Sequence, residues 1–186
     1  TGGSGATGSP GASGAPGGAA NQDAIIIYGL YFGPAADGET RVLDPLRKID
    51  TPIFDETKRL PYSAAQRTLS FDYPQGGRYY WRSLFVDHFS DELLAVMAAH
   101  AQNRVSPQSR LGVWTMGGKV RSIDSVSTAV PYRNASFMIA VESNWTDESR
   151  DAENIQWGRD AWRDMHEYST GGVYLNFAGI GHEPKE

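Results

Sequence analysis

The sequence predicts an α+β fold: a largely antiparallel sheet with helices packed on one face and the other face left as the ligand side. Three observations support it. Short runs rich in β-branched and aromatic residues predict strands, two amphipathic runs predict long helices, and the two kinds do not alternate as regular βαβ units. The face away from the helices needs a partner, because several large aromatics fall on the predicted strands: Tyr79, Tyr80, Trp81 and Trp114.

The N-terminal segment has a simple composition. Residues 1–20 contain only Gly, Ser, Thr, Ala and Pro, and glycine recurs at every third position from Gly5 to Gly17. That period is typical of collagen, but the composition equally fits a flexible linker. We interpret 1–23 as a disordered linker and 24–186 as one domain.

The domain is expected to begin with a buried strand over 24–32, which is rich in Ile and Tyr. Apolar residues at helical spacing follow over 37–49, where Pro45 splits or kinks the helix. Residues 52–60 are expected to be irregular, and 61–69 to form a short helix that its own proline opens.

Five further runs are predicted to be strands. Aromatic residues make the first of them the strongest prediction in the chain, and a Gly117-Gly118 turn joins the second to the third. The runs cover residues 78–85, 110–116, 119–123, 137–145 and 171–177.

Two longer helices are predicted between these strands. Ser90 caps the first, whose buried stripe is Leu93, Leu94, Met97 and Ala101. Asp147 or Ser149 caps the second, which runs to about Tyr168. Its predicted inner face consists of Ala152, Ile155, Trp162 and Met165.

Composition excludes several classes of function. The net charge of −5 and the scattered Lys and Arg argue against a nucleic-acid surface. The absence of cysteine excludes disulfides, thiol catalysis and Cys-ligated zinc. No apolar run approaches the ~20 residues that span a bilayer, and no basic-then-apolar signal pattern begins the sequence. We therefore expect a soluble, cytoplasmic protein without a membrane or nucleic-acid partner.

Common catalytic motifs are missing from the sequence. The four histidines do not share metal-ligand spacing, so no metal site is expected. No GxSxG or Walker pattern occurs, and no GxGxxG pattern lies between a predicted strand and a predicted helix. Serine-hydrolase chemistry and a nucleotide-binding loop therefore have no support.

Tyr174 and Asn176 are the first candidate pair for chemistry. Residues two apart in a strand point to the same face, and Gly171-Gly172 allow a sharp turn and a close approach just before them. A phenol beside an amide suits proton removal from an alcohol or binding of a polar ligand. The alternative is a packed sheet tyrosine with a hydrogen-bond partner.

Strand alternation gives further candidate pocket residues. If their faces coincide with that of Tyr174 and Asn176, the sheet presents an aromatic, sulfur-lined surface with one cation, which suits a flat and largely apolar ligand. The alternative, that half of them form the core under the helices, stays open because alternation does not say which face is which. The candidates are Tyr80 with Arg82, Trp114 with Met116, and Met138 with Ala140 and Glu142.

An ordered set of landmarks adds a family resemblance. Together the landmarks resemble the substrate domain of berberine-bridge-enzyme-like, FAD-linked oxidoreductases of the vanillyl-alcohol-oxidase type, over residues 24–179. They are Pro61-Tyr62 with Gln66, Gly76-Gly77 with the run Arg78 to Ser83, Ser90-Asp91-Glu92, Gly117-Gly118, Pro131-Tyr132-Arg133, Asn144-Trp145, and the run Gly172 to Phe177.

The resemblance implies a role for several residues. In such enzymes a separate domain binds FAD, and the sheet of the substrate domain roofs the flavin ring. Tyr174 would then lie over the flavin and take the proton of the substrate hydroxyl, with Asn176 supporting the site. Arg82 stands where the family often has a lysine facing the pocket.

The sequence also departs from the family pattern. A Gly-rich segment stands where the flavin-binding domain is expected, and the chain stops within ten residues of Asn176. Sugar-oxidising members carry a carboxylate where residues 114–116 are apolar, which favours a less polar substrate.

We therefore expect a fragment or split substrate domain of an FAD-dependent oxidoreductase, inactive alone, whose partners are a flavin-binding domain or subunit and a small-molecule substrate. Hydride transfer to the flavin, with proton removal by Tyr174, is the implied mechanism. The alternative is a free-standing small-molecule binding module.

Overall fold

The computed structural model describes residues 23–179, so residues 1–22 of the predicted linker lie outside the described part. The chain divides into two compact units, Thr1–Tyr73 and Pro74–Glu186.

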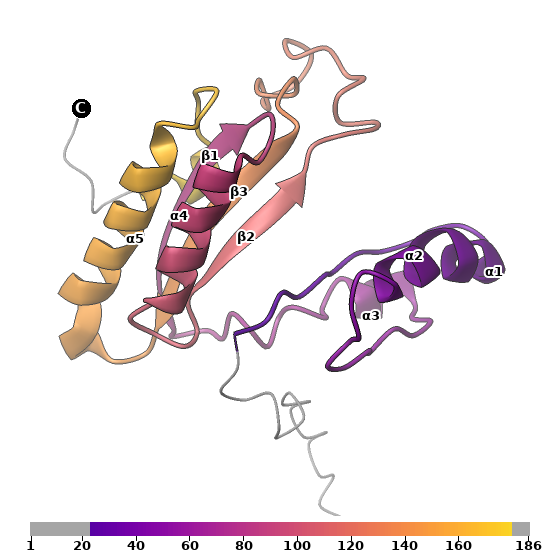
Figure 1. The fold of residues 1–186 in the computed structure, drawn as a ribbon, viewed down its shortest axis with the longest axis horizontal. Coiled ribbons are helices and arrows are strands. Elements are labelled where there is room, and N and C mark those ends of the chain that lie inside the picture. Colours follow the sequence, from indigo (N-terminus) through magenta and orange to yellow (C-terminus); the bar gives the residue numbers. More distant parts are fainter. Residues whose placement is uncertain (1–22, 180–186) are drawn as a thin grey trace, which may run out of the picture. The chain divides into compact units, whose positions relative to one another are not determined.

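The second unit is built on a three-stranded antiparallel sheet (Figure 1). β3 lies between β1 and β2, so β1 and β2 run parallel to each other on either side of it. The strand predictions for 78–85, 110–116 and 137–145 are confirmed to within one residue. The strands are β1 (Arg78–Val86), β2 (Arg110–Thr115) and β3 (Phe137–Trp145).

Two helices, α4 (Asp91–Gln102) and α5 (Asp151–His166), pack side by side on one face of this sheet (Figure 1). A short 3-10 helix, η2 (Glu148–Arg150), leads into α5. The predicted α+β class with helices on one face is confirmed. The core between the layers consists of Leu84, Val86, Leu93, Ile139, Val141, Trp157, Ala161 and Met165.

The start of α4 follows the prediction. Ser90 Oγ accepts a hydrogen bond from the Leu93 backbone N–H at 3.2 Å, and two acidic residues in the first turn suit the positive end of the helix dipole. Leu93 is buried as expected, but Leu94 is 49% exposed. One position along a helix is a rotation of about 100°, which turns Leu94 away from the sheet.

The inner face of α5 differs from the prediction. Ala152 is exposed, Ile155 and Trp162 are half-buried, and Met165 is fully buried. Trp157 rather than Trp162 enters the core, because the buried positions follow one continuous stripe at spacings of three and four. That stripe is Asn154, Trp157, Gly158, Ala161 and Met165.

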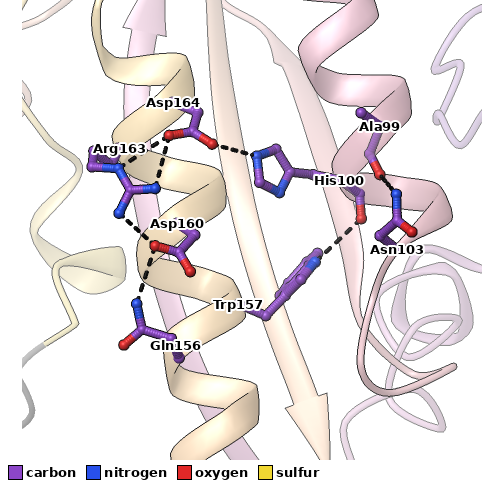
Figure 2. A network of polar contacts seen from close by, with 8 residues as sticks. All are labelled: Ala99, His100, Asn103, Gln156, Trp157, Asp160, Arg163 and Asp164. Carbon is purple, nitrogen blue, oxygen red and sulfur yellow. Dashed lines mark hydrogen bonds and ion pairs between the residues drawn. The ribbon is translucent and has the colours of Figure 1, made fainter.

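Polar contacts join α4 to α5 at their surface (Figure 2). His100 Nε2 lies 3.0 Å from Asp164 Oδ2, and the Trp157 indole N–H donates to the His100 carbonyl at 3.2 Å. Arg163 extends the network by pairing with both Asp164 and Asp160. His100 thus contacts α5 through both its side chain and its backbone.

The strand predicted at 119–123 is wrong: these residues form turns. Ser122 Oγ donates to the Lys119 carbonyl at 3.0 Å, and Asp124 Oδ1 accepts from the Val126 N–H at 3.0 Å. Short polar side chains here bond to nearby backbone groups and so compete with strand pairing.

In the first unit, helical structure runs without interruption over residues 35–47. Pro45 therefore does not split this helix as predicted, although a π-helical turn precedes it. A short helix follows Pro61, as predicted. The elements are α1 (Ala35–Gly38), η1 (Glu39–Leu43), α2 (Asp44–Arg47) and α3 (Tyr62–Ala65).

The buried strand predicted at 24–32 is wrong. These residues belong to no strand, and Ile25 and Phe32 are 93% and 76% exposed. β-branched and aromatic residues favour a strand only when another backbone pairs with them, and within residues 23–73 the structure contains no strand to do so.

Removing the Asp164 charge should make the stability of the fold less dependent on pH. Burial alone would raise the pKa of the Asp164 carboxyl, but hydrogen bonds from His100 and Arg163 outweigh burial and hold this pKa below its ordinary value of 3.8. A carboxyl with a lowered folded pKa stabilises the fold above its unfolded pKa and loses this contribution as the pH falls through the folded pKa. Because the Asp164 side chain is 41% exposed, we expect Asp164→Asn to cost less than ~1 kcal/mol near pH ~6. The cost should be smaller near pH ~3, where more of the wild-type carboxyl is protonated.

Urea unfolding at both pH values measures this difference. Glu167→Gln, an exposed charge removal just beyond α5, is the control. A deficit of Asp164→Asn that is the same at both pH values would contradict the prediction.

Gly158→Ala should destabilise the second unit. A Cβ at this position of α5 would lie 2.8 Å from Tyr80 Cδ1, and Tyr80 is only 2% exposed and cannot swing away. Overpacking of this kind costs ~1–3 kcal/mol, of which the better helix propensity of alanine returns at most ~1 kcal/mol. Gly117→Ala, where the new Cβ meets nothing within 4 Å, is the control in urea unfolding, and equal midpoints for the two variants would refute the close packing.

Candidate functional site

The face of the sheet opposite α4 and α5, here called the open face, is the candidate site. Leu84 and Ile139 point into the core under the helices, so the residues on either side of them in sequence point the other way. The strand register arranges these residues in three cross-strand rows. The rows are Trp81–Glu142–Arg110, Ser83–Ala140–Gly112 and Phe85–Met138–Trp114.

The middle row of the open face consists of small residues, and the C-terminal segment bonds to one of them, Ser83. Ser83 Oγ accepts a hydrogen bond from the Tyr174 backbone N–H at 2.8 Å. The carbonyls of Tyr174 and Phe177 each lie 3.4 Å from the same oxygen and can accept its proton. A larger side chain at position 83 would hold this segment away from β1.

The segment that carries Tyr174 is not the predicted strand. Gly171 and Gly172 adopt φ of +96° and +80°, and η3 (Leu175–Phe177) is a 3-10 helix. Positive φ interrupts an extended backbone, and the Ser83 hydroxyl takes the Tyr174 N–H that a strand ladder would use. The strand prediction over 171–177 is therefore wrong.

Tyr174 and Asn176 nevertheless lie side by side, as predicted. The Asn176 side-chain amide donates a hydrogen bond to the Tyr174 phenol oxygen at 2.7 Å. Tyr174 keeps extended dihedrals as the residue before η3, which directs its ring over the sheet. The amide is exposed and the phenol is half-buried, so the pair stands at the border between the open face and solvent.

Phe177 joins the aromatic side chains of the open face into one cluster. Its ring centroid lies 5.2 Å from that of Tyr174, 4.9 Å from Trp81 and 6.4 Å from Trp114, all in edge-on geometry. Trp114 is 50% exposed. A second group of buried and half-buried residues adjoins Phe177 and Tyr174, consisting of Phe85, Met116, Ala135 and Met138.

Glu142 brings a carboxylate into this largely apolar surface. The residue is only 3% exposed, and its Oε2 lies 3.5 Å from Arg110 Nε. A Cβ at Gly112 would lie 3.1 Å from Glu142 Oε1 and 3.4 Å from Trp114 Nε1. The glycine therefore leaves room beside a carboxylate oxygen and an indole N–H, an acceptor and a donor for polar groups.

Tyr80 and Arg82 do not join Tyr174, so the expectation that their face coincides with that of Tyr174 is wrong. Tyr80 is buried against Gly158 of α5. The Arg82 guanidinium lies 3.6 Å from the ring centroid of Trp162, also on α5. Alternation fixed which residues share a face but not which face, and a cation–π contact explains why a charged side chain lies on the helix side.

The other sequence candidates lie on the open face. Trp114 and Glu142 flank Gly112, and Met116 and Met138 belong to the group beside Tyr174. Sequence reasoning missed Ser83 and the central place of Phe177. The alternation that paired Tyr80 with Arg82 places Ser83 on the opposite face of the strand, but the contacts of its hydroxyl come from a segment about ninety residues away.

Neither a metal-binding cluster nor a helix able to span a membrane occurs within residues 23–179. These residues contain no cluster of three or more His, Asp or Glu side chains arranged to bind a metal ion. In the same part of the chain, every helix is too short or too polar to cross a membrane.

Comparison with known proteins gives two sequence relatives, and both are oxidases. The chain is 29% identical over 128 residues to a hexose oxidase of Chondrus crispus. It is 24% identical over 132 residues to an aclacinomycin-N/aclacinomycin-A oxidase of Streptomyces galilaeus. These matches cover 65% and 68% of this chain but only 23% and 19% of the relatives, so the chain spans about a quarter of their length or less. No protein-family model matches the sequence.

Solved structures share the fold. CrmK, a flavoenzyme involved in caerulomycin biosynthesis, superposes with a TM-score of 0.62 at 23% identity, over 80% of this chain and 33% of CrmK. Aclacinomycin oxidoreductase gives a TM-score of 0.52 at 17% identity, over 78% of this chain and 37% of that enzyme.

The resemblance inferred from the ordered landmarks is therefore confirmed: this chain is similar to one part of the larger, berberine-bridge-enzyme-like, FAD-linked oxidoreductases, and FAD is the cofactor expected with it.

Proposed function

We propose that this chain forms the substrate side of an FAD-dependent oxidoreductase that oxidises an alcohol or similar small organic molecule. The observation that carries the proposal is the Tyr174–Asn176 pair at the border of an aromatic open face. Such a pair places a proton acceptor beside a surface on which a flat substrate can lie.

The described residues suit one face of a flavin ring but not the whole cofactor. Tyr174, Phe177 and the half-exposed Trp114 offer aromatic surface to a flat ring. No Walker pattern, and no GxGxxG between a strand and a helix, is available to bind phosphates. The proposal therefore includes a flavin-binding domain or subunit as partner, and bound flavin would supply the acceptor for a hydride.

Tyr174, in its deprotonated phenolate form, is the proposed acceptor of the substrate proton. The Asn176 amide donates its N–H to the phenol oxygen at 2.7 Å, and a donor of this kind stabilises negative charge on that oxygen. The Tyr174 backbone is bonded to Ser83 at 2.8 Å, so the ring is positioned relative to β1. Asn176 supports the acceptor and does not itself take the proton.

The remaining candidates are proposed to bind substrate. Trp114, Met116 and Met138 supply apolar contact, and Glu142 supplies a hydrogen-bond acceptor beside Gly112. An exposed aromatic surface with one shielded carboxylate favours a flat, largely apolar substrate that carries a hydroxyl or amino group over a fully polar sugar.

Tyr174→Phe should slow flavin reduction by roughly 10²–10⁴ when the chain is tested in its flavin-loaded assembly. The change removes one oxygen and almost no volume, so folding and substrate binding should survive. Single-turnover reduction measures the chemistry without contributions from product release. Tyr132→Phe is the matched control, because Tyr132 packs on Phe85 with ring centroids 5.1 Å apart and has no proposed role in proton transfer.

Reduction at the wild-type rate in Tyr174→Phe would remove the catalytic assignment. It would leave the alternative, a binding module without chemistry of its own.

The chain alone should purify without flavin, because it lacks a phosphate-binding loop and a cysteine or other recognisable tether. We expect the chain as purified to be colourless, without the yellow colour of bound flavin. Stoichiometric FAD in that preparation would show that the cofactor site lies within this chain.

A further inference from the structure

Ser83 is the residue at which the sheet, α5 and the Tyr174 segment meet. It lies in the middle of β1 and is 0% exposed. Its carbonyl accepts a hydrogen bond from the Trp162 indole N–H of α5 at 2.9 Å. Its hydroxyl, on the other side of the sheet, accepts from the Tyr174 N–H at 2.8 Å.

The Tyr174 segment has two further attachments to β1, one at each end. The Thr170 N–H donates to the Phe85 carbonyl at 2.8 Å, and an isolated bridge joins Ala178 to Arg82. Between these two points the backbone contains two glycines with positive φ. Ser83 Oγ is thus the contact from β1 that holds the backbone of Tyr174, while the Phe177 N–H bonds to the Tyr174 carbonyl within the segment.

Packing alone does not explain a serine at this place. Its row neighbours are Ala140 and Gly112, and alanine would fill the same small space at position 83. What alanine cannot do is accept the Tyr174 N–H and offer a proton to the Tyr174 or Phe177 carbonyl, both 3.4 Å away.

We infer that Ser83 is a positioning residue for Tyr174: its hydroxyl sets where the phenol stands above the open face. This inference rests on the proposed function for its catalytic meaning, since it is the proton acceptor that would be displaced. A misplacement of about 1 Å in a reacting group can cost about 10² in rate. The Asn176 contact would move with Tyr174, because the two belong to the same turn.

Ser109→Ala provides a matched control for Ser83→Ala. Ser109 is also buried, at 4% exposure, and its Oγ also accepts a backbone N–H, that of Asn144 on β3, at 3.0 Å. Both variants lose the same kind of hydrogen bond inside the same unit, and only Ser83 touches the Tyr174 segment. A merely structural role predicts the same behaviour for both.

The test has two readouts. Amide hydrogen exchange, followed by NMR on the full chain, reports the Tyr174 backbone. Single-turnover flavin reduction in the flavin-loaded assembly reports the chemistry. We expect Ser83→Ala to speed exchange at the Tyr174 amide at least ~10-fold more than Ser109→Ala does. We also expect it to slow reduction ~10–100-fold at saturating substrate, while Ser109→Ala reduces at nearly the wild-type rate.

A conservative variant guards against misfolding. Ser83→Cys keeps a weak acceptor and nearly the same shape, so both effects should appear in the same direction and be smaller. If Ser83→Ala does not fold, Ser83→Cys takes its place against Ser109→Ala.

The outcomes separate this inference from the proposed function. Equal Tyr174 exchange in the Ser83 and Ser109 variants would overturn the positioning role, whatever the rates. If Tyr174→Phe slows reduction and the Ser83 variant does not, the positioning role also fails while the proposed function stands. If Tyr174→Phe reduces at the wild-type rate, the proposed function fails, and the exchange readout alone decides whether Ser83 positions the ring.

Discussion

The central strand β3 is buried along eight of its nine residues, and the rest of the second unit depends on that double-sided burial. On one side Ile139 and Val141 pack under α4 and α5. On the other side Met138 packs with Phe85 and with the segment that carries Tyr174 and Phe177. A three-stranded sheet has little apolar area to spare, so the C-terminal segment is part of the structure of the unit as well as the bearer of its candidate acceptor.

The open face combines a nearly buried carboxylate with an exposed tryptophan, two features that do not stabilise an isolated domain. Glu142 is 3% exposed and lies 3.5 Å from Arg110, and taking a carboxylate out of water costs free energy. Trp114 stays 50% exposed although its ring also contacts Phe177. A shielded acceptor beside exposed aromatic area is poor for the stability of an isolated unit and well suited to binding a substrate, which is why these features support a site.

Local sequence signals predicted much of this fold, and the errors have physical causes. The strands at 78–85 and 137–145 were predictable because aromatic and β-branched residues there also have partners in the sheet. The same composition at 24–32 predicted a strand that the structure does not contain, because no strand within residues 23–73 pairs with it. Alternation could group Tyr80 with Arg82, but only the position of α5 decides that both lie beneath it. Long-range contacts such as Ser83 with Tyr174 leave no local pattern to read.

The pairing of Tyr174 with Asn176 was predicted for the wrong reason, because the prediction assumed a strand and the structure has a turn and a 3-10 helix. In a strand, the two side chains would be neighbours because of the pleat, and the ladder would hold them. In the structure, the chain turns at two glycines and begins a 3-10 helix, so the side-chain amide reaches the phenol across a single turn. A strand would spread the task of placing the phenol over several ladder hydrogen bonds. A turn leaves this task to a few contacts, and the Ser83 hydroxyl is the contact from the sheet to the Tyr174 backbone.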